Sequence, residues 1–342
     1  MAAILDTISN ILICRTDNIG DVVLTLPLAG FLKNHFPGIR VEFLVRGYAA
    51  PVAQACLFVD RVHSLETIID AEQFFRDGAW SGVIFAWPEP HLARAAKRAK
   101  IPLRVGHSQR LHHWLSCNKL AHFSRSNPPL HEAQINFKFL RPLGILVQPD
   151  LPHIIPWFGL EARPDVSLEI WAQRDTFYLI LHPKSGGHGR EWPWQHYLAL
   201  AQLLAPQQDI VLWLTGSAKE GEYLQQHAPD LLEQQNIVNL CGKLTLSELI
   251  SLIARADGLI ASGTGPLHLA AALGRPALGL FPPVKHIGQV RWGALGAHAQ
   301  NIATNQPCNT CTDAENCRCM RQILPQQVAQ VVAKWKNLHE AA

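Results

Sequence analysis

Two stretches of this chain have the pattern of a buried strand, a turn and the start of a helix, and they constrain its fold more than any other feature. The first is Arg15-Thr16-Asp17-Asn18-Ile19-Gly20-Asp21-Val22, which follows the apolar run from Ile11 to Cys14. The second runs from Ser262 to Ala272 and follows Gly258 to Ala261. Helix N-termini offer unpaired N–H groups and a partial positive charge, which suits them to bind phosphate. The pair predicts a two-domain nucleotide-handling enzyme, with both turns facing one cleft.

Apolar runs alternate with helical stretches in both halves of the chain, and a Pro-rich passage around Pro156 separates the halves. This alternation predicts an α/β fold with two parallel-sheet domains, 1–160 and 161–324. A last helix, in 325–342, is expected to pack back on the first domain. The predicted strands are Ile11 to Cys14, Val41 to Val45, Val83 to Ala86, Leu103 to Val105, Phe177 to Leu181, Ile210 to Leu214, Ile237 to Leu240, Gly258 to Ala261 and Ala277 to Leu280. Predicted helices include Val22 to His35, His91 to Lys100 and Pro325 to Glu340.

The composition excludes several classes of protein. Hydrophobic residues make up 48% and charged residues 17% of 342 residues, which is typical of an ordered globular chain. A formal charge of +3 is too small to indicate nucleic-acid binding by itself. Neither a signal peptide in Met1 to Asn10 nor an apolar run of roughly 18 residues is visible, so we expect a cytoplasmic protein.

The motifs together, in their order along the chain, resemble glycosyltransferase family 9, the bacterial lipopolysaccharide heptosyltransferases. The resemblance rests on Gly20-Asp21-Val22 with Leu26-Pro27, on the segment His182 to Pro193, and on Thr264-Gly265-Pro266-Leu267-His268 with its alanine-rich helix. It implies two facing Rossmann-like domains of GT-B type with an interdomain cleft. The N-terminal half would bind the acceptor, the C-terminal half would bind an ADP-sugar, and transfer would invert the anomeric carbon.

Asp21 has two interpretations. In any protein a first-turn acid is favoured by the helix dipole or as a cap. The resemblance implies instead that Asp21 is the general base that takes a proton from the acceptor hydroxyl. Asp17, four residues earlier, is assigned an accessory role in binding the acceptor, the alternative being that it faces water.

The glycine-rich segment from His182 to Arg190 is either a surface loop or a diphosphate site. The family resemblance implies that it binds the diphosphate, with Arg190 as the catalytic cation two residues before Trp192. A guanidinium binds two phosphate oxygens at once, which suits this position. Ser185 is the expected hydroxyl donor, and Lys184 is a further donor-binding residue.

The second turn is expected to complete the phosphate site. Gly265 permits close approach of the backbone, Thr264 supplies a hydroxyl, and His268 lies one turn into the helix. For His268, packing beneath the turn is an equal alternative. The family usually has an acid immediately before the threonine, and this chain has Gly263, which leaves the identity of the donor sugar open.

The resemblance extends to the nucleoside. Glu220 matches the family's acid for the ribose hydroxyls, although a helix-start glutamate is the alternative, and Leu244 matches the apolar contact of the adenine pocket. The sequence has no Asp-x-Asp motif of the kind that holds a divalent ion beneath a sugar nucleotide. We therefore expect metal-independent catalysis that requires no cofactor.

Residues 91–131 contain no Asp or Glu but many cations, including Arg104 and Arg110. Such a run is either a solvated face or a binding surface for an anionic partner. The family's acceptor is an anionic, lipid-linked glycan, so Arg104 and Arg110 are assigned to acceptor binding, and peripheral contact with the inner membrane is expected. Nucleic acid is not expected as a partner, because the net charge is modest and no binding module is present.

Four cysteines cluster near the C-terminus, and their spacing is compatible with a metal site. A structural zinc, reduced thiols and disulfides all remain open, since the Cys-x-Cys spacing is tight for a standard zinc knuckle. We therefore commit to no metal. The residues are Cys308, Cys311, Cys317 and Cys319.

The sequence thus predicts an inverting, metal-independent glycosyltransferase that moves a heptose from ADP-heptose to a lipopolysaccharide-core acceptor. One alternative is a related family 9 transferase that uses another nucleotide sugar for a different surface glycan. The other is a nucleotide-binding subunit without turnover.

Overall fold

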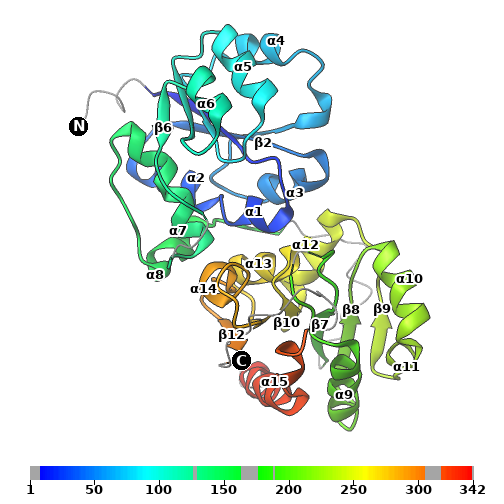
Figure 1. Ribbon diagram of the computed structural model, residues 1–342. Helices are drawn as coiled ribbons and strands as arrows, with labels where there is room; N and C mark the ends of the chain where they lie inside the picture. The colour runs from blue at the N-terminus through cyan, green and yellow to red at the C-terminus, as the bar shows by residue number, and fades with distance from the viewer. Residues whose placement is uncertain (1–7, 126–128, 163–175, 188, 305–316, 341–342) are drawn as a thin grey trace. The chain divides into compact units, whose positions relative to one another are not determined.

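The computed structural model describes residues 8–125, 129–162, 176–187, 189–304 and 317–340. The chain divides into two units, Met1–Glu161 and Ala162–Ala342, each built on a six-stranded parallel sheet with helices around it (Figure 1). The predicted α/β class with two parallel sheets is confirmed. The strand order is β3-β2-β1-β4-β5-β6 in the first unit and β12-β11-β10-β7-β8-β9 in the second. Both are the doubly wound order, in which the direction of winding reverses beside the first strand.

Every predicted strand occurs, and each sheet also contains one or more edge strands that the sequence does not predict. The first sheet consists of β1 (Asn10–Cys14), β2 (Arg40–Val45), β3 (Arg61–Ser64), β4 (Gly82–Phe85), β5 (Leu103–His107) and β6 (Lys119–Ala121). The second consists of β7 (Phe177–His182), β8 (Ile210–Leu214), β9 (Ile237–Asn239), β10 (Gly258–Ser262), β11 (Ala277–Phe281) and β12 (Ala299–Ala303).

The helix predicted from Val22 to His35 is two helices. The first ends at Val23 and the next begins at Pro27, because proline has no N–H and is favoured in the first turn of a helix. The helices of the first unit are α1 (Ile19–Val23), α2 (Pro27–His35), α3 (Ala50–Gln54), α4 (Ala71–Gly78), α5 (Pro90–Arg98), α6 (Leu111–Ser116), α7 (Glu132–Asn136) and α8 (Leu151–Ile154). Those of the second are α9 (Trp194–Leu204), α10 (Ala218–His227), α11 (Pro229–Leu232), α12 (Leu246–Arg255), α13 (Gly265–Ala272), α14 (Gln289–Trp292) and α15 (Pro325–Glu340).

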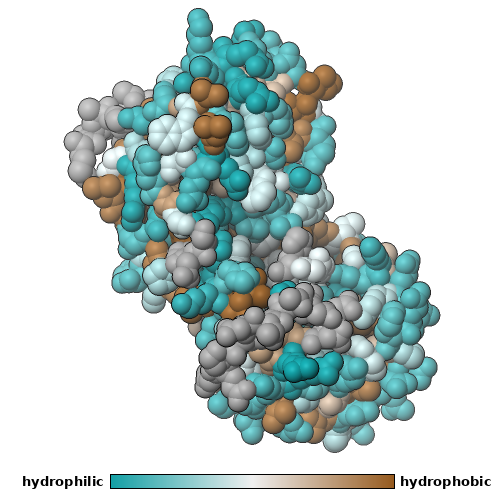
Figure 2. Space-filling model, viewed as in Figure 1, coloured by the Kyte–Doolittle hydropathy of each residue, from teal (hydrophilic) through white to brown (hydrophobic). Residues whose placement is uncertain are grey.

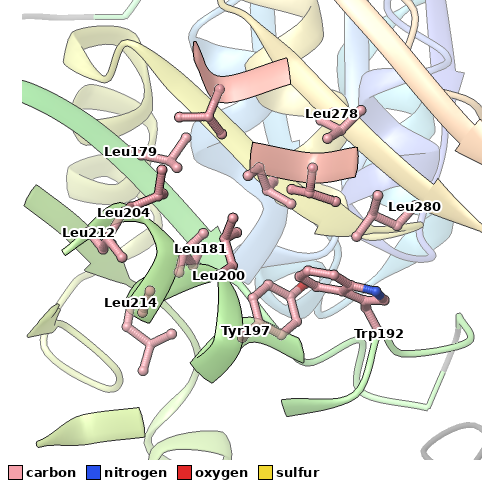
Figure 3. Packing of buried hydrophobic residues seen from close by; sticks show 14 of the residues in the cluster. Leu179, Leu181, Trp192, Tyr197, Leu200, Leu204, Leu212, Leu214, Leu278 and Leu280 are labelled. Atoms are coloured by element: carbon pink, nitrogen blue, oxygen red, sulfur yellow. The ribbon is translucent and has the colours of Figure 1, made fainter. Parts of the chain in front are cut away.

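The core of the second unit lies between its sheet and α9. Leucines of β7 and β8 pack against Tyr197, Leu200 and Leu204 of that helix, and all three helix side chains are almost fully buried (Figure 3). Burial of such side chains is the main stabilising contribution to a sheet–helix layer. The same core fixes the loop after β7, because the indole Nε1 of Trp192 donates to the carbonyl of Ile323 at 2.8 Å.

The last helix, α15, belongs to the second unit, which corrects the expectation that it packs on the first domain. Val328, Val332 and Trp335 are part of the second unit's buried core. The Trp335 ring lies so close to the backbone of β10 that a Cβ at Gly258 would be 2.5 Å from it. At the polar edge, Nζ of Lys336 pairs with Asp209 at 2.8 Å. The apolar face of α15 is therefore satisfied within its own unit.

Candidate active site

Three of the predicted site residues follow strands at the point in each sheet where the winding reverses. In the first sheet this point lies between β1 and β4, and in the second between β7 and β10. Ligands of open α/β sheets bind beyond the carboxyl ends of the strands at such points. The loops after β1, β7 and β10 carry Asp21, Ser185 and Thr264, respectively.

A fully buried guanidinium holds both predicted acids of the first unit. Nε of Arg15 donates to Oδ1 of Asp17 at 2.8 Å, and its Nη2 donates to Asp21. A third acid, Glu132 of α7, lies 3.8 Å from the same Nη2. Burial lowers the pKa of Arg15, but the three carboxylates outweigh it and hold this pKa above its ordinary value. The sequence does not reveal this role of Arg15 or of Glu132, because their contact joins distant segments.

The backbone of Asp21 is also held in place. Oγ1 of Thr25 donates to the Asp21 carbonyl at 2.7 Å, and Nδ2 of Asn136 donates to the same Oγ1 at 3.1 Å. The Asp21 side chain is 14% exposed, so it is positioned but reachable. A helix-dipole interaction alone would require neither the buried cation nor this support.

Asp17 is more enclosed than Asp21. Its side chain is 6% exposed, and the Tyr48 hydroxyl donates to its carbonyl at 2.9 Å. Burial, together with the charge of Asp21, raises the pKa of Asp17 to about 6, although Arg15 opposes this shift. Asp17 therefore serves the geometry of the loop and does not simply face water.

A cavity of about 280 Å³ lies at the carboxyl ends of β4 and β5. Nδ1 of His107 accepts from the Gln109 N–H at 3.0 Å, while its buried Nε2 has no hydrogen-bond partner among the described residues. Burial and nearby cations lower the pKa of His107 to about 4, so the ring is neutral and Nε2 carries a proton. The cavity is lined by Phe85, Ala86, Trp87, Pro88, His107, Gln109, Arg110, Arg125 and Phe139.

The two predicted acceptor-binding arginines have different surroundings. Arg110 lines this cavity. Nε of Arg104 instead donates to the Ser116 carbonyl at 2.8 Å, and its Nη1 donates to the Ile101 carbonyl. Arg104 therefore ties β5 to the end of α6, and an acceptor would have to replace these bonds.

In the second unit, an acid that no sequence motif singles out organises the loop after β7. Glu191 accepts from the N–H of Ser185 at 2.8 Å and from its Oγ at 3.0 Å. Its other oxygen pairs with Nζ of Lys184 at 2.7 Å. Gly186 and Gly187 have φ angles of 58° and 82°, a region that favours glycine. Glu191 thus fixes Ser185 and Lys184, while Arg190 beside it is partly buried.

The loops after β7 and β10 contact each other. The Trp192 N–H donates to Oγ of Ser262 at 3.1 Å, and a Cβ at Gly189 would lie 3.0 Å from the carbonyl oxygen of Gly263. Thr264 is the N-cap of α13, but its buried Oγ1 makes no cap bond and has no hydrogen-bond partner among the described residues. A buried hydroxyl at a helix N-terminus, beside a glycine-rich loop, is suited to bind an anion.

Three further donor-site candidates have structural contacts of their own. His268 is buried one turn into α13, with its ring 6.5 Å from that of Trp292. The Glu220 carboxylate accepts from the Ser217 N–H at 2.7 Å in a capping box of α10. Leu244 is partly buried just before α12. His268 therefore packs beneath the turn, and Glu220 caps the start of its helix, as their alternative interpretations expect. Neither contact prevents the residue from binding a ligand.

The cysteine cluster is described only in part. Cys308 and Cys311 lie outside the described residues, while Cys317 and Cys319 are buried in the core of the second unit. Among the residues that are described, no group of three or more His, Cys, Asp or Glu side chains is arranged to hold a metal ion.

Comparison with known proteins identifies the family. The model of glycosyltransferase family 9 (heptosyltransferase) matches residues 146–319. The chain belongs to this family. As a family 9 enzyme it is a glycosyltransferase, and the predicted resemblance is confirmed.

Relatives of this family 9 glycosyltransferase match it over different lengths. A putative glycosyltransferase of Haemophilus influenzae is 25% identical over 87% of this chain and 89% of its own. The lipooligosaccharide heptosyltransferase 2 of that organism is 33% identical, but over only 39% of this chain and 41% of its own. The structure of Escherichia coli ADP-heptose lipopolysaccharide heptosyltransferase II has the same fold, with a TM-score of 0.73, 19% identity, and coverage of 97% and 100%. In the described part of the chain, no helix has both the length and the apolar character to cross a bilayer.

Proposed function

We propose that this family 9 glycosyltransferase transfers a heptose from ADP-heptose to an anionic, lipid-linked lipopolysaccharide core, with inversion and without a metal cofactor, at the cytoplasmic face of the inner membrane. The names of its relatives support a heptose donor and a lipopolysaccharide acceptor. The structural observation that supports the proposal most directly is the buried Oγ1 of Thr264, without a partner among the described residues, at the N-terminus of α13.

In this mechanism, Asp21 takes the proton of the acceptor hydroxyl as that oxygen attacks the anomeric carbon and the bond to the diphosphate breaks. Negative charge then develops on the leaving ADP. The helix N-terminus, the hydroxyls of Thr264 and Ser185, and the cations Lys184 and Arg190 are placed in loops that can stabilise this charge. Cationic side chains and helix ends replace the divalent ion that other transferases place beneath the diphosphate.

The cavity of the first unit supports an anionic acceptor. Arg110 contributes positive charge to its lining, as does Arg125, which also pairs with Glu132. His107 is a further lining residue, and its buried Nε2 has no hydrogen-bond partner among the described residues. A carboxylate or phosphate of the acceptor would pair with these groups, and aromatic residues such as Trp87 would contact a sugar ring. Because the His107 ring is neutral with its proton on Nε2, it can donate a hydrogen bond without adding to the positive charge of the two arginines.

A second candidate donor follows from Gly263. Because the family usually has an acid here that contacts the donor, its absence favours a transferase for another nucleotide sugar. Calorimetric titration with ADP, UDP and GDP and their sugar conjugates, without added metal, tests both candidates. Tightest binding of ADP-heptose is expected, and a preference for a UDP- or GDP-sugar would overturn the donor assignment. Dependence of transfer on an added divalent cation would overturn metal-independence.

A further inference from the structure

Helix α6 presents its apolar residues to solvent and its polar residues to the protein. Leu111, Trp114 and Leu115 are 81%, 56% and 72% exposed, and their spacing places them on one helix face. His113 and Ser116, on the opposite face, are buried. A surface helix ordinarily has the reverse arrangement. Figure 2 shows hydrophobic side chains within a hydrophilic surface where Figure 1 draws α6. Exposed apolar side chains that gather on one helix face are typical of an interaction site.

The orientation of α6 is fixed by its buried face. Nδ1 of His113 accepts from the His107 N–H at 2.8 Å, and a Cβ at Gly106 would lie 2.6 Å from the His113 ring. The Trp114 indole N–H donates to the Ser108 carbonyl at 2.7 Å, although the ring itself is half exposed. Rotation that would bury the apolar face would break these contacts, so the exposed face is a stable feature.

Three cations lie on α6 or on the helix packed against it. Nζ of Lys97 donates to the Leu115 carbonyl at 2.7 Å. Arg94 is an exposed residue of α5, which packs against α6, and Arg110 is the exposed N-cap residue of α6. Within the described residues, none of the three cations forms an ion pair, and residues 91–131 contain no acid that would neutralise them.

We propose that Leu111, Trp114, Leu115, Arg94, Lys97 and Arg110 form a docking surface for an anionic lipid bilayer. The leucines and the indole would enter the interfacial region, and the cations would pair with anionic headgroups. Charge complementarity selects the bilayer over a second copy of this chain, because two copies joined face to face would bring the same cations together. The inference rests on the proposed function: Arg110 borders α6 and also lines the acceptor cavity, so a lipid-linked acceptor would be presented beside that cavity.

Vesicle co-sedimentation tests this surface without any acceptor or donor present. The vesicles contain phosphatidylcholine alone or with about 30% phosphatidylglycerol, at low and high salt. The protein is expected to bind the anionic vesicles, less at high salt, and Leu111→Ser/Leu115→Ser is expected to lower the partition coefficient at least tenfold. Leu338→Ser is the matched control, because Leu338 of α15 is 70% exposed, and it should bind like the unaltered protein.

The charged part of the docking surface is tested separately. Arg94→Gln should lower binding to anionic vesicles by about fivefold, the usual contribution of one basic residue near such a surface. Arg61→Gln, an exposed arginine of β3, should have no effect. Equal binding of Arg94→Gln and Arg61→Gln would overturn the role of these cations.

Three further measurements separate the outcomes. Unchanged vesicle binding by Leu111→Ser/Leu115→Ser would overturn the proposal. It would also be overturned if the unaltered protein did not bind vesicles but formed a concentration-dependent dimer that this variant abolishes. Thermal unfolding confirms that the variant is folded. Transfer to a delipidated, water-soluble acceptor tests the proposed function independently. If the unaltered protein transfers the sugar but does not bind vesicles, only the docking surface is overturned. If it binds vesicles but does not transfer the sugar, only the proposed function is contradicted.

Discussion

Arg15 and Asp17 form a 2.8 Å charged hydrogen bond in the loop after β1, and the other arm of the same guanidinium binds Asp21. One buried cation therefore sets the distance between two acids that lie in the same turn. Without it, the carboxylates of Asp17 and Asp21 would repel each other in a site from which water is largely excluded, while Glu132 would keep its ion pair with Arg125.

Replacing Arg15 by Gln should destabilise the first unit strongly. Removing one partner of a buried charged network typically costs about 3–5 kcal/mol, because the remaining charges are left uncompensated. Urea unfolding measures this loss. Arg61→Gln, on the exposed edge of the sheet, is the control and should change stability by less than about 0.5 kcal/mol. Equal stability of the two variants would show that the network does not hold the loop.

Asp21→Asn separates catalysis from binding. The amide keeps the size of the side chain but cannot accept a proton, so the turnover number should fall by about 10²–10⁴-fold, the usual contribution of a general base. Donor affinity in calorimetry should remain within about twofold, since the loops that we propose to bind phosphate belong to the second unit. Asp17→Asn should reduce turnover less. Full turnover by Asp21→Asn would exclude this residue as the base.

Two buried histidines predict that the first unit loses stability in acid. The pKa values of His107 and His113 are lowered to about 4, mainly by burial. Below the ordinary histidine pKa near 6.5, the unfolded chain binds protons that the folded chain does not, so stability should fall from about pH 6.5 to pH 4. His113→Asn should show a smaller fall when thermal unfolding is followed across this range.

The raised pKa of Asp17 has the opposite effect on how stability depends on pH, so Asp17→Asn is a contrasting variant. Between about pH 4 and 6 the folded state holds a proton on this carboxyl that the unfolded state has lost. The contribution of Asp17 to the free energy of unfolding therefore decreases as the pH rises. Asp17→Asn should therefore make the acid-induced loss of stability steeper, whereas His113→Asn should make it shallower. Slopes that change in the same direction would contradict one of the two assignments.

The interior of each sheet could be predicted from the sequence, whereas most edge strands could not. Interior strands such as β7 are buried at every position and give continuous apolar runs. The strands β3, β6 and β12 lie at sheet edges and have the sequences RVHS, KLA and AQNIA. Their partial exposure leaves no apolar pattern to distinguish them from loops.

The positions of the candidate site residues could be predicted only where these residues lie within one motif. Asp21, Ser185 and Thr264 each follow a recognisable strand, and the structure places them at the points where the winding reverses. Arg15 and Asn136, which contact each other, are 121 residues apart, and no local pattern links them. Glu191 lies within the predicted loop, but its function depends on the fold of that loop and not on a residue spacing.

Thr264→Val tests whether the buried hydroxyl binds the donor. Valine has the same shape but no polar atom, so the free protein should be as stable as before, because this hydroxyl has no hydrogen-bond partner among the described residues. ADP binding should weaken by about fivefold, which corresponds to one lost hydrogen bond of about 1 kcal/mol. Thr245→Val is the control. Oγ1 of Thr245 caps α12, so this variant should lose stability but keep ADP affinity.

Gly263 stands where the family usually has an acid, and the structure gives a steric reason why a side chain does not fit there. A Cβ at Gly263 would lie 2.9 Å from Cε1 of Phe281, a fully buried residue at the end of β11. Gly263→Ala should therefore lower the free energy of unfolding by about 1–3 kcal/mol, the usual cost of overpacking a core.

The energetic coupling between positions 263 and 281 can be measured with Phe281→Leu. Alone it should also destabilise the protein, because it leaves space in the core. Combined with Gly263→Ala it should cost less than the sum of the two single changes, because the smaller side chain makes room for the new methyl group. Urea unfolding of the four proteins gives the coupling energy, and strictly additive effects would show that Phe281 does not restrict this position. A favourable coupling would mean that an acid at position 263 requires a changed residue at 281, so the donor contact could not be restored by Gly263→Asp alone.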